Sequence, residues 1–219
     1  MSLRHARITA ALALLLVSVA SAVHATTLWD QSAISFSSSA PGIYNGKFTG
    51  FGGSTSYCLN DVTVPAGGWT INTITEYFSN ETFADMQLTA PNGYLIIMPK
   101  TGSLPVGAPT TTTVPLTWVA TTQGVQSVYV MTASGLNVNL AAGDYWITVA
   151  PITPVDNFNG NNLQWPALTT LGAPVATYNG ATWSDLYPGY DGAFKIDGTG
   201  GGATPTRAGT WGSLKALYR

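Results

Sequence analysis

Apolar and polar residues alternate through most of the chain, a pattern that predicts β-strands. The stretch 61–78 shows this most clearly. Valines there alternate with polar neighbours, residues 65–68 interrupt the chain with Pro and Gly, and the alternation resumes at Trp69. The apolar parity changes near Asn72-Thr73, which predicts a β-bulge or a local twist of the strand. The stretch therefore predicts a strand, a turn and a second strand that places Trp69 in the core.

Further short strands are expected between turns rich in Gly, Pro and Asn. Asn45-Gly46 predicts a hairpin, residues 141–144 are expected to turn one strand back beside the next, and Pro115 favours a sheet edge. Roughly nine to eleven short strands are typical of an all-β, antiparallel two-sheet β-sandwich or jelly roll. The expected strands are 34–36, 56–64, 69–78, 83–88, 94–98, 114–118, 128–130, 136–140, 145–149, 175–178 and 194–196.

Residues 1–25 are predicted to be a signal peptide. Basic residues precede an apolar run from Ile8 to Ala20, and Val23-His24-Ala25 supplies a small-residue cleavage site. The apolar run is shorter than the ~20 residues that a membrane-spanning helix needs, so an uncleaved anchor is the less favoured alternative. We expect an exported mature chain that begins near Thr26 and has no transmembrane helix.

Removal of this leader limits the chemistry of the mature chain. Both histidines, His5 and His24, lie in the leader, which excludes Ser-His-Asp and Cys-His catalytic triads. Cys58 is the only cysteine, so it has no intrachain disulfide partner and is expected as a small buried residue. These features favour a non-enzymatic protein.

Charge is unevenly distributed along the chain. Residues 26–202 contain three lysines, no arginine and ten acidic residues. An acidic body disfavours nucleic acid as a partner, and the lack of arginine leaves no guanidinium clamp for phosphate. The last thirteen residues, 207–219, are basic and contain no acid.

Three stretches carry a resemblance to known proteins: 61–71 (D-V-T-V-P-A-G-G-W-T-I), 140–149 (L-A-A-G-D-Y-W-I-T-V) and 193–198 (A-F-K-I-D-G). They resemble secreted bacterial β-sandwich domains that precede C-terminal anchoring or sorting signals, loosely of the pre-peptidase C-terminal type. The resemblance implies a sandwich over residues 26–198, and such domains sometimes bind sugars or calcium. It brings no catalytic residues. The chain departs from a Pro-Glu-Pro type of anchor because it lacks that motif and a terminal apolar helix.

The segment 183–191, W-S-D-L-Y-P-G-Y-D, is the candidate ligand site. Exposed aromatic rings beside carboxylates are suited to stacking on sugar rings. The favoured alternative is that Trp183 and Tyr187 are buried core anchors. Asp185 and Asp191 also raise the alternative of an acid/base pair for glycoside hydrolysis. The candidate residues are Trp183, Asp185, Tyr187, Tyr190 and Asp191.

A loop rich in oxygen atoms, 156–162, is the candidate metal site. Hard cations such as Ca²⁺ take oxygen ligands, but a single carboxylate binds weakly unless Asp144 or Asp191 joins it. The alternative is an ordinary polar turn, and no other cofactor is expected. The candidate ligands are Asp156, Asn157, Asn159 and Asn161.

A Gly-rich linker, 199–206, is predicted to connect the sandwich to a C-terminal tail, 207–219. The tail resembles T-W-G-x-x-K-x-x-Y-R ends of otherwise unrelated secreted bacterial proteins, which implies a sorting or attachment signal. The alternative is a tail that packs back on the sandwich. The residues that match this pattern are Thr210, Trp211, Gly212, Lys215, Tyr218 and Arg219.

Taken as a sequence, the chain predicts a non-enzymatic, secreted or cell-surface bacterial protein with a structural, adhesive or interaction role. Its expected partners are glycans or envelope components, together with sorting machinery that reads the tail. One alternative is a carbohydrate-binding module that uses residues 183–191, and a second is a glycoside hydrolase with an Asp pair.

Overall fold

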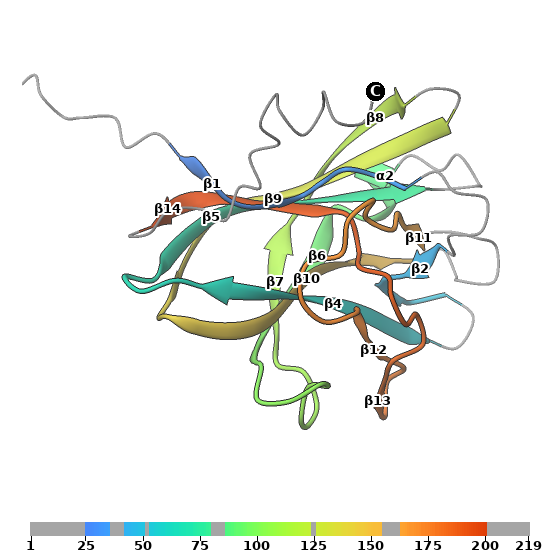
Figure 1. Ribbon diagram of the computed structural model, residues 1–219. Helices are drawn as coiled ribbons and strands as arrows, with labels where there is room; N and C mark the ends of the chain where they lie inside the picture. Colours follow the sequence, from blue (N-terminus) through green and yellow to red (C-terminus); the bar gives the residue numbers. More distant parts are fainter. Residues whose placement is uncertain are drawn as a thin grey trace, which may run out of the picture.

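The computed structural model describes residues 25–35, 42–50, 53–79, 86–123, 126–154 and 163–200. Within these ranges, fourteen strands form two sheets that lie as two layers in Figure 1. The predicted all-β sandwich is therefore confirmed. The predicted leader before residue 25, the metal loop 156–162 and the tail 207–219 lie outside the described residues.

The first sheet is built around its long central strands β5 and β9, which pair antiparallel. β8 extends the sheet beyond β9, while β14 and then β1 extend it on the other side of β5. Its strands are β1 (Thr26–Gln31), β2 (Ile43–Tyr44), β5 (Trp69–Ser79), β8 (Thr117–Gln123), β9 (Gln126–Leu140), β11 (Leu163–Gln164) and β14 (Phe194–Gly200). β14 thus continues two residues into the segment expected as a linker.

The second sheet has the order β13-β12-β4-β3-β10-β6-β7, with a further pairing of β4 to β10. β3 and β10 run parallel, and the other pairs are antiparallel. Pro115 ends the edge strand β7, as its missing N–H predicts. The strands are β3 (Gly46–Phe48), β4 (Thr55–Val64), β6 (Asn92–Pro99), β7 (Thr111–Pro115), β10 (Gly143–Thr153), β12 (Ala176–Tyr178) and β13 (Trp183–Ser184).

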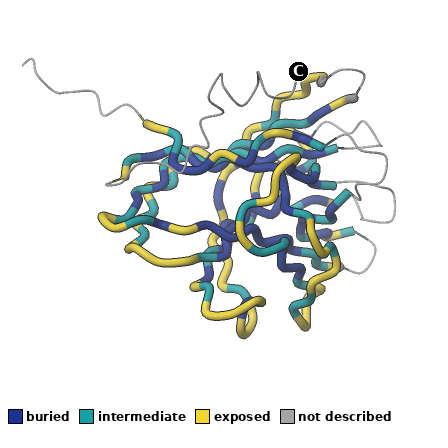
Figure 2. Tube along the Cα trace, viewed as in Figure 1, coloured by how far each residue is buried: buried dark blue, intermediate teal, exposed yellow. Residues whose placement is uncertain are grey.

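The main core lies between the two sheets, where the alternating apolar residues of both meet. Trp69 is 4% exposed and packs against Trp29 with ring centroids 6.5 Å apart, which confirms its predicted place. The predicted bulge is also present, because the pairing of β5 with β9 shifts register between Ile71 and Thr73. Figure 2 shows buried residues along the strands and exposed residues mainly in turns and loops.

Two predicted hairpins are wrong, because their turns connect strands of different sheets. β2 belongs to the first sheet and β3 to the second, so Asn45 carries the chain across the sandwich. Residues 141–142 likewise connect β9 in the first sheet to β10 in the second. Turn residues predict that the chain reverses, but the partner of each strand is set by contacts distant in sequence.

Other strand predictions need smaller corrections. Residues 86–88, expected as the end of the strand 83–88, lie instead in the short helix α2 (Met86–Thr89), where the side chain of Met86 alone is buried. The predicted strand 114–118 is divided between β7 and β8, which lie in different sheets. Ile34 forms only an isolated bridge with Ala167, so the first strand is instead β1. Among the described residues, no helix has the length and apolar character needed to cross a membrane.

Candidate functional site

Four aromatic rings form a continuous row on the second sheet, which we call the aromatic row. Its members are Tyr94 of β6, Tyr57 of β4, Tyr178 of β12 and Trp183 of β13. Ring centroids lie 6.4 Å apart between Tyr94 and Tyr57, 6.1 Å between Tyr57 and Tyr178, and 4.8 Å between Tyr178 and Trp183. The row thus connects four strands of one sheet.

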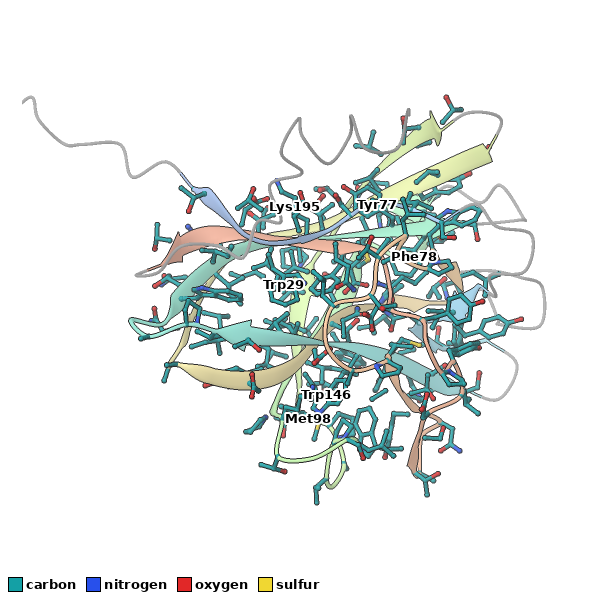
Figure 3. The ribbon with its side chains drawn as sticks, viewed as in Figure 1. Trp29, Tyr77, Phe78, Met98, Trp146 and Lys195 are labelled. Carbon is teal, nitrogen blue, oxygen red and sulfur yellow. The ribbon has the colours of Figure 1, made fainter. Side chains whose placement is uncertain are left out.

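Strand register explains why these rings meet. Tyr178 lies directly opposite Tyr57 in the β12–β4 pair and opposite Trp183 in the β12–β13 pair. Residues opposite each other in antiparallel strands project to the same side of a sheet. The row belongs to the same cluster as Trp146 and Met98, and Figure 3 places these two residues on the far side of the second sheet from Trp29. The aromatic row is therefore on the outer face of the sandwich.

The aromatic row is only partly open to solvent. Tyr94, Tyr178 and Trp183 are half-buried, whereas Tyr57 is buried, and this burial raises the pKa of its phenol to about 12. The indole Nε1 of Trp183 donates a hydrogen bond to the carbonyl of Gly107 at 2.6 Å, which ties the row to the loop 100–110. The half-buried rings keep part of their surface in contact with solvent.

The structure divides the predicted ligand segment 183–191 into three environments. Trp183 ends the aromatic row, and Asp185 beside it is exposed. Tyr187 and Tyr190 pack against the buried cluster of Ile43, Cys58 and Val175, which the core-anchor alternative predicted for Tyr187. Asp191 is completely buried. The segment therefore does not present its five candidate residues on one surface.

Asp191 and Asp185 do not form an accessible carboxylate pair. The Asp191 Oδ2 atom accepts a hydrogen bond from the Leu171 N–H at 3.0 Å, and burial raises the pKa of this carboxyl to about 7. Glycoside hydrolysis needs two carboxyl groups that both reach the substrate. In this structure a substrate can contact Asp185 but not Asp191.

The sequence analysis did not identify a polar centre that lies between the sheets. β4 pairs with β10 only as far as Asn60 opposite Ile147, and β3 then separates the two strands. The backbone N–H groups of Cys58 and Val149 lie beyond this branch point. Buried N–H groups need hydrogen-bond acceptors. Since β4 and β10 no longer pair here, side chains must supply these acceptors.

Asn45 and Glu76 supply these acceptors. Glu76 Oε1 accepts hydrogen bonds from the Val149 N–H at 2.8 Å and from Thr148 Oγ1 at 3.0 Å. Asn45 Oδ1 accepts from the Cys58 N–H at 3.3 Å, and its Nδ2 donates to Glu76 Oε2 at 3.1 Å and Thr148 Oγ1 at 2.9 Å. This network joins β5 of the first sheet to β4 and β10 of the second.

Burial controls the ionisation of this centre. Glu76 has no exposed surface, and desolvation raises the pKa of its carboxyl to about 8 despite the hydrogen bonds from Val149, Thr148 and Asn45. Burial, together with the nearby Glu76, also raises the pKa of the Cys58 thiol well above its usual value. Cys58 is buried, as predicted, and its Sγ lies 2.7 Å from the Tyr44 carbonyl. The arrangement holds the fold together and keeps its titratable groups away from solvent.

A second group of buried polar side chains surrounds Gly192. Gln31 Nε2 donates to the Gly192 carbonyl at 3.2 Å, and the Gly192 N–H donates to Asn60 Oδ1 at 2.7 Å. The Gln164 amide occupies the space that a Cβ at position 192 would need. The remaining amide atoms, Gln31 Oε1, Asn60 Nδ2 and Gln164 Oε1, have no protein partner among the described residues.

Two surface pockets lie away from the predicted segment. One, of about 460 Å³, is lined by residues including Gly68, Thr70 and Asn139 at one end of the sandwich. The other, of about 370 Å³, lies between β6, β7 and β9 and is lined mainly by apolar side chains such as Leu95 and Val138. Neither contains a residue of 183–191 or of the aromatic row.

The chain matches no protein-family model, no curated protein and no solved structure in the comparisons made. The resemblance to pre-peptidase C-terminal domains and to T-W-G-x-x-K-x-x-Y-R tails therefore stays a prediction.

Proposed function

We propose that this protein is a non-enzymatic, exported β-sandwich with a structural or adhesive role at the cell surface or outside the cell. The observation that carries the proposal is that the carboxylates of the protein bind other groups of the protein itself. Among the described residues, each Asp and Glu except Asp185 has a hydrogen-bonding or ionic protein partner. These carboxylates contact strands and loops of the protein itself, so they do not form an accessible pair that could act on a bound substrate.

Export is supported by the signal peptide predicted over residues 1–25, and surface placement by the basic tail 207–219. The test compares cell fractionation and melting temperature of the full chain with those of a chain ending at residue 203. Truncation is expected to change localisation while leaving the melting temperature nearly unchanged. A large drop in melting temperature with unchanged localisation would instead assign the tail to the fold.

Glycan binding is the second candidate, and the aromatic row favours it. Three half-buried rings in line, with the exposed Asp185 next to Trp183, provide stacking surfaces and a hydrogen-bond acceptor. Sugar rings stack on such surfaces while their hydroxyl groups bind nearby polar atoms. Binding of this kind would give the adhesive role a ligand class without requiring catalysis.

A glycan array with matched variants tests this candidate. Trp183→Ala is expected to abolish binding and Asp185→Asn to weaken it. Tyr145→Ala removes another half-buried ring that lies outside the aromatic row and should leave binding unchanged. A blank array for the wild-type protein would leave the structural role as the proposed function. Turnover of any arrayed polysaccharide would contradict the non-enzymatic assignment.

A further inference from the structure

A lysine and an aspartate meet across the outer face of the second sheet. Asp61 lies on β4 opposite Trp146 of β10, and Lys100 directly follows β6 on the other side of β10. Lys100 Nζ reaches over the Trp146 ring, 5.0 Å from its centroid, and contacts Asp61 Oδ2. The two side chains are only 20% and 8% exposed. This pair is therefore largely removed from water.

A third titratable residue, Asp191, is connected to the pair through the loop 171–173. The Ala173 N–H lies 3.1 Å from each carboxylate oxygen of Asp61, while the Leu171 N–H donates to Asp191 Oδ2 at 3.0 Å. Between them, Gly172 has a φ of +92°, and a Cβ there would lie 2.4 Å from Asp61 Oδ2. Only glycine allows the backbone this conformation and this approach. One short loop thus holds both carboxyl groups.

Asp191 is equipped to exchange a proton here. It has no exposed surface, and its Oδ1 has no protein partner among the described residues. The pKa of this carboxyl is raised to about 7: burial is the largest cause and the charge of Asp61 adds to it, while the Leu171 N–H and the charge of Lys100 act in the opposite direction. Asp191 is therefore near enough to both members of the pair to sense their charges, and much of it is uncharged at neutral pH.

We propose that Lys100 and Asp61 become joined by an intramolecular amide bond, with Asp191 carrying the proton that the reaction moves. The proposal concerns a modification of the fold itself and does not depend on the proposed function. The Asp61–Lys100–Asp191 group would give this chain a covalent cross-link between β4 and the end of β6. Cys58, the only cysteine in the sequence, cannot supply such a link as an intrachain disulfide.

The reaction is a condensation that needs no oxidant or reductant. A proton first passes from the Lys100 ammonium to the Asp61 carboxylate, which leaves a neutral amine beside a neutral acid. The Nζ lone pair then attacks Asp61 Cγ, and a new Nζ–Cγ bond forms. Asp191 gives its proton to the departing oxygen of Asp61 and takes one from Nζ. The Cγ–O bond breaks, one water leaves, and Asp191 ends as it began.

Two isomeric variants of the full chain provide the sharpest test. Lys100→Arg retains a positive charge beside Asp61 but should not form the amide, whereas Lys195→Arg makes the same exchange at the ion pair with Asp197, where Nζ–Oδ1 is 2.9 Å. The two variants have the same calculated mass. Intact-mass measurement is expected to find Lys195→Arg lighter by one water, and the wild-type protein should show the same deficit from its own calculated mass.

Two further variants test the mechanism. Asp61→Asn should lose ammonia in place of water, and peptide sequencing should find residues 61 and 100 in one branched peptide. Asp191→Asn should fold, as judged by circular dichroism, but retain its full mass. A wild-type protein of full calculated mass would overturn the proposal and leave Lys100 and Asp61 as an ion pair, whether or not the variants fold. Cross-linking that proceeds normally in Asp191→Asn would remove Asp191 from the mechanism.

Discussion

The interior of the sandwich has two ends that are built differently. At the apolar end, β4 contributes Val62 and Val64 and β5 contributes Trp69 and Ile71, all buried. At the polar end, the inner face of β4 carries Asn60, and β5 and β1 carry the buried residues Glu76 and Gln31. Glu76 and Gln31 both lie opposite Phe194, so the change from apolar to polar occurs at one level across neighbouring strands.

Strand pairing explains the difference between the two ends. At the apolar end β4 and β10 pair directly, so backbone groups satisfy one another and side chains are free to be apolar. At the polar end β4 leaves β10, and the unpaired N–H groups of Cys58 and Val149 require Asn45 and Glu76. The comparison shows that buried polar residues lie where β4 and β10 stop pairing with each other. The two ends should therefore respond differently to mutation and to pH.

The largest change in stability is expected when a large buried side chain is removed from the apolar end. Trp69→Ala removes a ring that is 4% exposed and packed on Trp29, and should lower the free energy of unfolding by ~3–5 kcal/mol. Urea denaturation measures this loss. Trp183→Ala, at a half-buried ring of the outer face, is the matched control and should cost less. A loss below ~1 kcal/mol at Trp69 would show that this end does not carry the core.

A substitution at the polar end should lower the free energy of unfolding by a smaller amount, because it removes hydrogen bonds and leaves little empty volume. Asn45→Ala removes two donated bonds and leaves the Cys58 N–H without its acceptor, which should cost about 2–3 kcal/mol. Asn139→Ala makes the same exchange at an exposed residue and should change stability by ~0.5 kcal/mol or less. Equal effects of the two substitutions in urea denaturation would refute the role given to Asn45.

The polar end should also make stability depend on pH. The pKa of Glu76 is raised from 4.5 to about 8 in the folded state, so its contribution is fully present below pH 4.5 and is lost as the pH rises towards 8. The free energy of unfolding should fall by at most ~1.4 kcal/mol per pH unit in this window. Denaturation of Glu76→Gln at several pH values should give a shallower slope, with Asp191, whose pKa is about 7, causing the remainder. An unchanged slope would exclude Glu76.

The smallest effect is expected from the thiol. Cys58 is fully buried, and burial raises the pKa of its thiol, so a thiol reagent should leave it unmodified in the folded protein. Adding a reductant should leave the melting temperature unchanged. Rapid modification under native conditions would indicate that the polar end opens, and would weaken the contrast between the two ends.

The sequence by itself determined the all-β class, the core position of Trp69, the bulge near Asn72 and the edge position of Pro115. Each of these depends on local alternation or on backbone chemistry, which neighbouring residues are sufficient to show. Burial of Cys58 also followed from its place in a predicted strand.

Only the tertiary structure decided which strands became partners. Asn45-Gly46 and residues 141–142 each connect two strands, but these strands lie in different sheets, and neither Asn45 nor Gly46 has the positive φ of a hairpin turn. The same limit applied to the candidate site. Asp191 was expected near Asp185 because the two are close in sequence, yet its carboxyl faces the loop at Leu171 in the interior. Glu76 shares the parity of Ile74, so the sequence pattern could place its side chain on the inner face. Its role as an acceptor for the Val149 N–H arises only because β4 and β10 separate, and that separation depends on strand pairing distant in sequence.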